Sequence, residues 1–184
     1  CYLKKDSGKI EICNLDLEEN EMFIKSKIGY LAENNPLYKN MYIKEYLYFI
    51  GALYKIQNLK SKIQEMVHTT GLQPEINKQI KSLSKGYKQR VGIAAALIHN
   101  PEVLILDEPT TGLDPNQLIE IRNLIKTIGK EKTVLLSTHI MQEVDKICDR
   151  VIIINKGKII DDKLISDFQK HNINIEQHFQ KLTT

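Results

Sequence analysis

Two adjacent carboxylates at the end of an apolar run are the residues best suited to chemistry. Val103–Leu106 is wholly apolar and is followed by Asp107 and Glu108. Such a run is typical of a parallel strand buried on both faces, and open α/β sheets bind ligands at the carboxyl ends of their strands. An acid there is costly unless it binds a cation or shares a proton. We therefore expect Asp107 to hold Mg²⁺ and Glu108 to accept a proton from an attacking water. The plainer alternative is a strand that ends in solvated acids.

A second stretch has the pattern of an anion-binding helix start. Ser84 is a good N-cap for a helix expected over Lys85–His99, and Gly86 lets the backbone approach a ligand closely. Free amides and the helix dipole favour an anion at such a position. An ordinary capped helix explains an isolated Ser-x-Gly equally well, so this stretch gains weight only from its neighbours.

The elements that must position these residues alternate between strands and helices. Strands are expected over Gly8–Cys13, Lys27–Leu31, Val103–Leu106, Thr133–Ser137, Val151–Ile154 and Lys158–Ile160. Helices are expected over Ile43–Ile56, Leu59–Thr70, Lys85–His99, Pro115–Ile128 and Ile140–Cys148, with a weakly helical tail from Ile173 to Thr184. This alternation predicts a parallel α/β sheet with a helical insertion over about residues 43–100.

The composition favours a globular domain and excludes several classes of protein. The chain has 184 residues, 42% of them hydrophobic and 27% charged, which suits one folded domain. Its 26 basic and 23 acidic residues are interleaved, so we expect no nucleic-acid partner. No apolar stretch approaches the roughly 20 residues needed to cross a bilayer. Cys1, Cys13 and Cys148 have no metal-binding spacing and are expected to be free thiols.

Four stretches together resemble the motifs of ATP-binding-cassette (ABC) ATPases. They are Leu83–Tyr87, Leu104–Glu108, Gly112–Asp114 and Ser137–His139, which resemble in turn the signature sequence, the Walker B strand, the D-loop and the switch histidine. Their order and spacing agree with the family over about residues 8–162. Residues 28–38 and 85–90 are in addition similar to ATP-binding proteins associated with bacterial gliding motility.

The resemblance implies a fold and a set of ligands. The fold would be that of a P-loop NTPase (RecA-like), a parallel sheet core with an inserted helical subdomain, incomplete at the N-terminus. A partial ABC ATPase domain would cover residues 1–162, followed by a C-terminal tail over 163–184. The ligands would be ATP and Mg²⁺, sandwiched in a head-to-tail dimer with a second ABC ATPase domain.

The resemblance also implies roles for single residues. Ser84 and the Gly86 amide would contact the γ-phosphate bound by the partner, and His139 would hydrogen-bond the same phosphate and help align the water. Asp107 would hold Mg²⁺ and Glu108 would be the general base. Asp114 has two compatible roles, because it would lie at the dimer seam and it can also cap the helix that starts at Pro115.

Three departures from the family pattern qualify this interpretation. No Gly-x-x-x-x-Gly-Lys-Ser/Thr phosphate loop occurs in the sequence, so we expect the sequence to start just after that loop. The isolated chain should then bind ATP poorly and be unstable or aggregate. Glu33 stands where the family has a glutamine, either as a second metal ligand or as a solvated loop acid. Lys85 and Tyr87 replace glycine and glutamine in the signature, and Lys85 either adds a cation near phosphate or points into water.

The leading hypothesis for function is the ATP-hydrolysing subunit of an ABC transporter. Such a subunit would be cytoplasmic and peripheral on the inner face of the cell membrane, bound to a transmembrane permease subunit. The apolar loop over Asn34–Tyr42 would face the permease, or would pack inside. One alternative is a degenerate, non-catalytic cassette that pairs with an active partner, against which the intact Asp107, Glu108 and His139 argue. Another is a soluble non-transport ABC ATPase, against which the single uninterrupted cassette argues.

Overall fold

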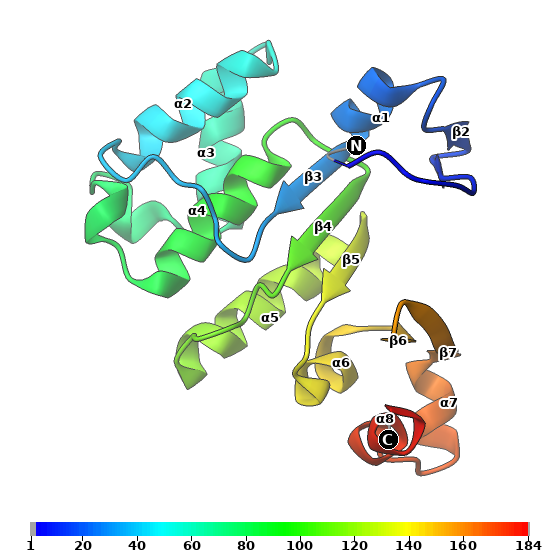
Figure 1. Ribbon diagram of the computed structural model, residues 1–184. Helices are drawn as coiled ribbons and strands as arrows, with labels where there is room; N and C mark the ends of the chain where they lie inside the picture. Colours follow the sequence, from blue (N-terminus) through cyan, green and yellow to red (C-terminus); the bar gives the residue numbers. More distant parts are fainter. Residues whose placement is uncertain (1–2, 184) are drawn as a thin grey trace. The chain divides into compact units, whose positions relative to one another are not determined.

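The computed structural model describes residues 3–183, and its contacts divide the chain into two compact units (Figure 1). The first unit is Cys1–Leu136 and the second is Ser137–Thr184. The segment expected as a tail from residue 163 therefore belongs to a unit that begins well before it. Cys13 and Cys148 are free thiols, whereas Cys1 lies outside the described residues.

The first unit opens with a short hairpin and a helix that the sequence did not suggest. Strands β1 (Glu11–Ile12) and β2 (Leu15–Asp16) pair antiparallel, and the turn residues Cys13 and Asn14 have φ of 53° and 60°. Two positive φ values are typical of a tight two-residue hairpin loop. The strand expected over residues 8–13 was thus wrong in length, because the turn ends it. Helix α1 (Glu21–Lys27) follows and buries Ile24.

The central sheet is the α/β core that the sequence predicted, and it has the strand order β3-β4-β5. Strand β3 (Ile28–Leu31) runs parallel to β4 (Val103–Asp107), with Ile28 opposite Val103 and Leu31 opposite Leu106. The third strand is β5 (Thr133–Ser137). Leu104 and Leu106 are fully buried, and Val103, Ile105 and Asp107, which alternate with them, are half-buried. The parallel pairing places the carboxyl ends of β3 and β4 at the same edge.

The chain between β3 and β4 is mainly helical, as expected. It comprises α2 (Ile43–Leu53), α3 (Leu59–Thr69), two short 3₁₀ turns (Gln73–Glu75 and Ile80–Ser82) and α4 (Lys85–Leu97). Figure 1 shows α4 beside β3, with α2 and α3 beyond it. Gly29 of β3 permits this close approach, because a side-chain carbon there would overlap the carbonyl oxygen of Ala96. Helix α4 is therefore fixed against the sheet that carries the carboxylates.

Helix α5 (Pro115–Gly129) connects β4 to β5 and packs against α4. Its buried face is made of Ile121, Leu124, Ile125 and Ile128, at the spacing expected of an amphipathic helix. The largest fully buried side chains of the first unit come from several of these elements and form its core: Ile24, Leu31, Ile43, Leu47, Leu72, Ile80, Ile93, Ile98, Leu104, Leu106 and Ile121.

The second unit has its own small core. It consists of α6 (Met141–Ile147), the antiparallel pair β6 (Arg150–Asn155) and β7 (Lys158–Leu164), α7 (Ile165–Lys170) and α8 (Ile175–Thr183). Val144, Ile165, Phe168 and Ile175 are buried together. The hairpin was expected, whereas α7 was not. Within residues 3–183 no helix combines the length and the apolar character that a membrane span requires.

Candidate functional site

The predicted carboxylates lie at one edge of the central sheet. Asp107 is the last residue of β4, and Glu108 follows it directly. Glu33 comes two residues after the end of β3 and is exposed. Because β3 and β4 are parallel and Leu31 is opposite Leu106, all three acids follow strand ends at the same edge. Asp107 and Glu108 are half-buried, which keeps both within reach of solvent and of a ligand.

Glu108 has a backbone conformation that the sequence did not reveal. Its φ is 47°, in the left-handed region that side chains other than glycine, asparagine and aspartate rarely adopt. The Thr111 amide donates to the Glu108 carbonyl at 3.3 Å, and the Thr111 hydroxyl donates to Glu108 Oε2 at 2.9 Å. The next residue of this turn is held as well, because Gln89 Nε2 donates to the Pro109 carbonyl at 3.0 Å in a buried hydrogen bond. Such strain costs of order 1–3 kcal/mol and is found mainly at functional sites.

The acids at this edge fit a magnesium ion by their chemistry. Mg²⁺ prefers oxygen ligands and is usually held by one or two carboxylates together with substrate phosphates and waters. Asp107 and Glu33 supply that number of carboxylates at one edge of the sheet. Among residues 3–183 no cluster of three or more histidine, cysteine or acidic side chains is assembled as a metal site.

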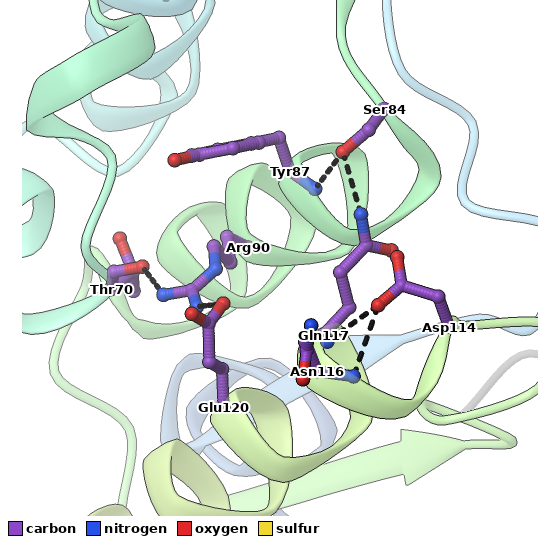
Figure 2. A network of polar contacts seen from close by, with 8 residues as sticks. All are labelled: Thr70, Ser84, Tyr87, Arg90, Asp114, Asn116, Gln117 and Glu120. Atoms are coloured by element: carbon purple, nitrogen blue, oxygen red, sulfur yellow. Dashed lines mark hydrogen bonds and ion pairs between the residues drawn. The ribbon is translucent and has the colours of Figure 1, made fainter.

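The start of α4 has the capped geometry that the sequence predicted. Ser84 is the N-cap, and its Oγ accepts a hydrogen bond from the Tyr87 amide at 3.3 Å. Gln117 Nε2 of α5 donates to the same oxygen at 3.2 Å, as Figure 2 shows. Gly86 is buried, and a side-chain carbon there would come within 2.7 Å of the Gln117 amide carbon. A larger residue at position 86 would displace the Gln117 side chain, so Gly86 allows this packing as well as the expected approach of a ligand.

Lys85 has a side-chain contact that the sequence did not suggest, and its role as a cation near phosphate stays a prediction. Its side chain is exposed, but its ammonium group lies against Gly112, where a β-carbon would overlap it. The φ of Gly112 is 69°, which favours glycine at this position, whereas the flexible Lys85 side chain can move aside for a larger residue. Lys85 therefore covers the loop between β4 and α5. The half-buried Tyr87 has its ring 5.8 Å from the Arg90 guanidinium carbon.

Asp114 caps α5, which confirms the capping role that the sequence predicted for this residue. Its Oδ1 accepts hydrogen bonds from the amides of Asn116 and Gln117, both at 3.0 Å, and Pro115 occupies the first helical position. This bond pattern satisfies two of the amides that an uncapped helix leaves free. The role of Asp114 at a dimer seam stays a prediction.

Arg90 ties the same helices together one turn further along (Figure 2). Its Nη1 donates to the Thr70 carbonyl at 2.7 Å, and its Nη2 pairs with Glu120 Oε2 at 2.5 Å. Glu120 lies three residues after Gln117, on the same face of α5. Two polar contacts therefore fix α5 to α4: Gln117 with Ser84, and Glu120 with Arg90.

His139 belongs to the second unit, where it is exposed between β5 and α6. Its neighbour Thr138 accepts a hydrogen bond from the Ile140 amide at 3.1 Å, which shapes the turn into α6. The role of His139 as a hydrogen-bond partner of the γ-phosphate stays a prediction.

Part of the predicted permease-facing loop is exposed. Tyr38 and Tyr42 are 54% and 44% exposed, while Leu37 and Met41 are half-buried. Tyr38 packs edge-on against Phe49 of α2, with ring centres 5.4 Å apart. The loop thus uses some apolar side chains for packing and presents others to solvent.

Comparison with known proteins establishes the family. The sequence model of the ABC transporter family matches residues 2–111, which is more than half of the chain and includes the Ser84 turn and both carboxylates of β4. The chain belongs to the ABC transporter family. The match ends before Asp114 and His139, so the role of Asp114 at a dimer seam and the role of His139 at the phosphate rest on the resemblance alone.

Relatives and solved structures agree with this family. The chain is 39% identical over 172 residues to the bacitracin transport ATP-binding protein BcrA of Bacillus licheniformis, covering 92% of this chain and 56% of BcrA. It is 37% identical over 162 residues to the ABC transporter ATP-binding protein NatA of Bacillus subtilis, covering 86% of this chain and 66% of NatA. The chain thus spans little more than half of the first of these relatives. The solved structure of cbiO1 from Clostridium perfringens, described as part of the ABC transporter complex cbiONQ, superposes with a TM-score of 0.82 at 29% identity. That superposition covers 98% of this chain and 75% of cbiO1.

Two contact residues near the predicted site were missed by sequence reasoning. Thr111 was given no role, although a hydroxyl three residues after an acid can reach its carboxylate through a turn. Gln117 stands three residues after the cap Asp114, where a capping box predicts that its side chain turns back to the cap. Instead its amide donates to Ser84 in another helix, a long-range contact that local pattern cannot reveal.

Proposed function

We propose that this chain is the ATP-binding and ATP-hydrolysing part of an ABC transporter subunit. Two such cassettes would pair head to tail, and the Ser84 turn of one would face ATP held by the other. The observation that carries the proposal is the Asp107–Glu108 pair at the carboxyl end of β4, with Glu108 held at a φ of 47°. A strained, half-buried acid at a ligand-binding edge favours a chemical role over a solvated strand end.

Glu108 is proposed as the general base. As the water oxygen forms its bond to the γ-phosphorus, Glu108 takes a proton from that water, and the bond from phosphorus to the β–γ bridging oxygen breaks. The Thr111 hydroxyl holds one carboxylate oxygen, Oε2, at 2.9 Å and so orients the group. Ser84 and the amides at the start of α4 would stabilise the negative charge on the γ-phosphate. His139 is proposed to donate to the same phosphate.

Asp107 and Glu33 are the residues that would hold Mg²⁺. The ion supplies charge neutralisation of the β- and γ-phosphates when it is bound. Asp107 is the stronger candidate because it is half-buried at the strand end, whereas Glu33 is exposed in a loop.

The exposed aromatic residues of the loop after β3 support a membrane partner. Tyr38 and Tyr42 present apolar surface next to α2, and apolar patches of this kind suit a protein contact. We propose that a transmembrane permease subunit docks here, which would place the protein in the cytoplasm, peripheral on the inner face of the membrane. The solved structure of cbiO1 is described as part of the ABC transporter complex cbiONQ, which is consistent with such an arrangement. A place in the gliding-motility-associated subfamily stays a prediction from the residues that resemble it.

Phosphate release by the whole gene product that contains this chain tests the proposal. We expect ATP hydrolysis that requires Mg²⁺ and is abolished by EDTA, together with dimer formation on addition of ATP. A folded gene product that binds ATP and forms the dimer without releasing phosphate would favour the non-catalytic cassette instead. A folded gene product that does not bind ATP at all would contradict both.

A further inference from the structure

The hydroxyl of Ser84 is held from two sides by groups that only donate. The Tyr87 amide reaches Oγ at 3.3 Å from within α4, and the Gln117 side-chain amide reaches it at 3.2 Å from α5 (Figure 2). We propose that Gln117 is a positioning residue, which orients the Ser84 hydroxyl so that its proton points to the γ-phosphate of ATP. This inference rests on the proposed function, because it assigns Gln117 a part in that site.

The argument follows from the hydrogen-bonding capacity of serine. A hydroxyl has one proton to donate and two lone pairs that accept. In this structure Tyr87 and Gln117 engage both lone pairs of Ser84. The proton then has no role inside the turn and is available to an acceptor outside it. Ser84 is exposed, so that acceptor can be a phosphate oxygen. An oriented donor needs no reorganisation when the anion arrives.

The Gln117 amide is itself held in place. Its backbone N–H donates to Asp114 at 3.0 Å, and its side chain packs over buried Gly86, where a larger residue would displace it. One turn further along α5, the ion pair of Glu120 with Arg90 fixes the helix to α4. The backbone of Gln117 is therefore fixed, and the contacts of its side chain with Gly86 and Ser84 restrict the freedom of that side chain.

The same contacts link two motifs within one chain. Asp114, in the stretch that resembles the D-loop, fixes the first turn of α5, and that turn carries the amide that contacts Ser84. A shift at the start of α5 would therefore change the orientation of the Ser84 hydroxyl. Residues of the D-loop and of the signature turn are joined by one hydrogen-bonded chain: Asp114, Gln117 and Ser84.

The variant Gln117→Glu tests the proposal with almost no change of shape. An ionised carboxylate cannot donate, so it would accept the Ser84 proton and draw it away from the phosphate. In the whole gene product carrying Glu108→Gln to slow hydrolysis, we expect ATP-dependent dimerisation to need about ten- to a hundredfold more ATP. Gln117→Met, which keeps the volume and adds no charge, should cause a smaller loss of several-fold.

The matched control is Asn116→Asp. It makes the same amide-to-carboxylate change one residue earlier in the first turn of α5, but leaves the bond from Gln117 to Ser84 in place. Its ATP requirement should stay within about threefold of the parent, because the added charge is exposed and screened. Thermal melts of all variants show whether the fold is kept.

A double-mutant cycle with Ser84→Ala separates positioning from a structural role. If Gln117 acts through Ser84, Gln117→Glu should add little further loss once the hydroxyl is gone. Full loss in the Ser84→Ala background, or equal behaviour of Gln117→Glu and Asn116→Asp, would overturn the inference. Failure of the parent itself to dimerise with ATP would instead contradict the proposed function.

Discussion

Asp114→Ala should lower the free energy of unfolding by about 1–2 kcal/mol. In the structure one carboxylate oxygen of Asp114 accepts from two amides at 3.0 Å, and alanine leaves both without a partner inside the helix. Loss of an N-cap typically costs around 1 kcal/mol, and the loss of a negative charge at the positive end of the helix adds a few tenths. The effect should be at the upper end because α5 carries four buried residues and a contact to Ser84.

Urea unfolding of the whole gene product measures this change as a lower midpoint with an unchanged slope. Asp114→Asn is the matched control, because asparagine caps as well as aspartate and removes only the charge. It should stay within about 0.5 kcal/mol of the parent. A midpoint unchanged in Asp114→Ala, or equally lowered in both variants, would refute the reasoning. If Asp114→Asn keeps its stability but loses ATP hydrolysis, the acid has a second role at the dimer seam.

Two further predictions follow from single contacts. Thr111→Val removes the hydroxyl that holds Glu108 Oε2, so kcat for ATP should fall by roughly three- to thirtyfold with KM little changed. Thr111→Ser keeps a hydroxyl and should retain most activity. Equal loss in both variants would contradict a positioning role for the hydroxyl. Burial, with a smaller effect of Lys132, lowers the pKa of His99, whose Nε2 is 3.0 Å from the Ile28 carbonyl. Since the unfolded chain binds this proton more readily, stability should be complete above a pH of about 6.5 and fall as the pH decreases toward the lowered pKa. His99→Gln should remove that part of the pH dependence, measured as the difference in urea midpoint between pH 7.5 and 5.5, and an unchanged difference would contradict it.

Much of the fold could be predicted because the pattern of apolar residues is strong. The solid apolar run before Asp107 predicted β4, and the 3.6-residue spacing predicted α2, α3 and α5 close to their observed bounds. Helix α1 was missed because its seven residues bury only Ile24 and offer no periodic stripe. Helix α7 was missed for the same reason, since Ile165 and Phe168 alone are buried in its six residues.

The sequence predicted which residues form the candidate site, but not their backbone conformation or their long-range contacts. Adjacent acids after an apolar strand and a serine before a helix are local patterns, and the structure places them as the sequence indicated. The left-handed backbone of Glu108 depends on the turn that follows it, and no residue preference predicts it. The contact of Gln117 with Ser84 joins residues 33 positions apart and exists only because α5 packs on α4. Lys85 likewise lies over Gly112 because the fold brings the two loops together.

Hydrolysis by Glu108→Gln in the whole gene product tests the central claim most directly. The amide keeps the size of the side chain but cannot accept the proton of the attacking water. The account predicts that phosphate release slows by roughly 10²–10⁴-fold while ATP still binds and still promotes dimerisation. Turnover equal to that of the parent would contradict the assignment of Glu108 as the general base and, with it, the proposed mechanism.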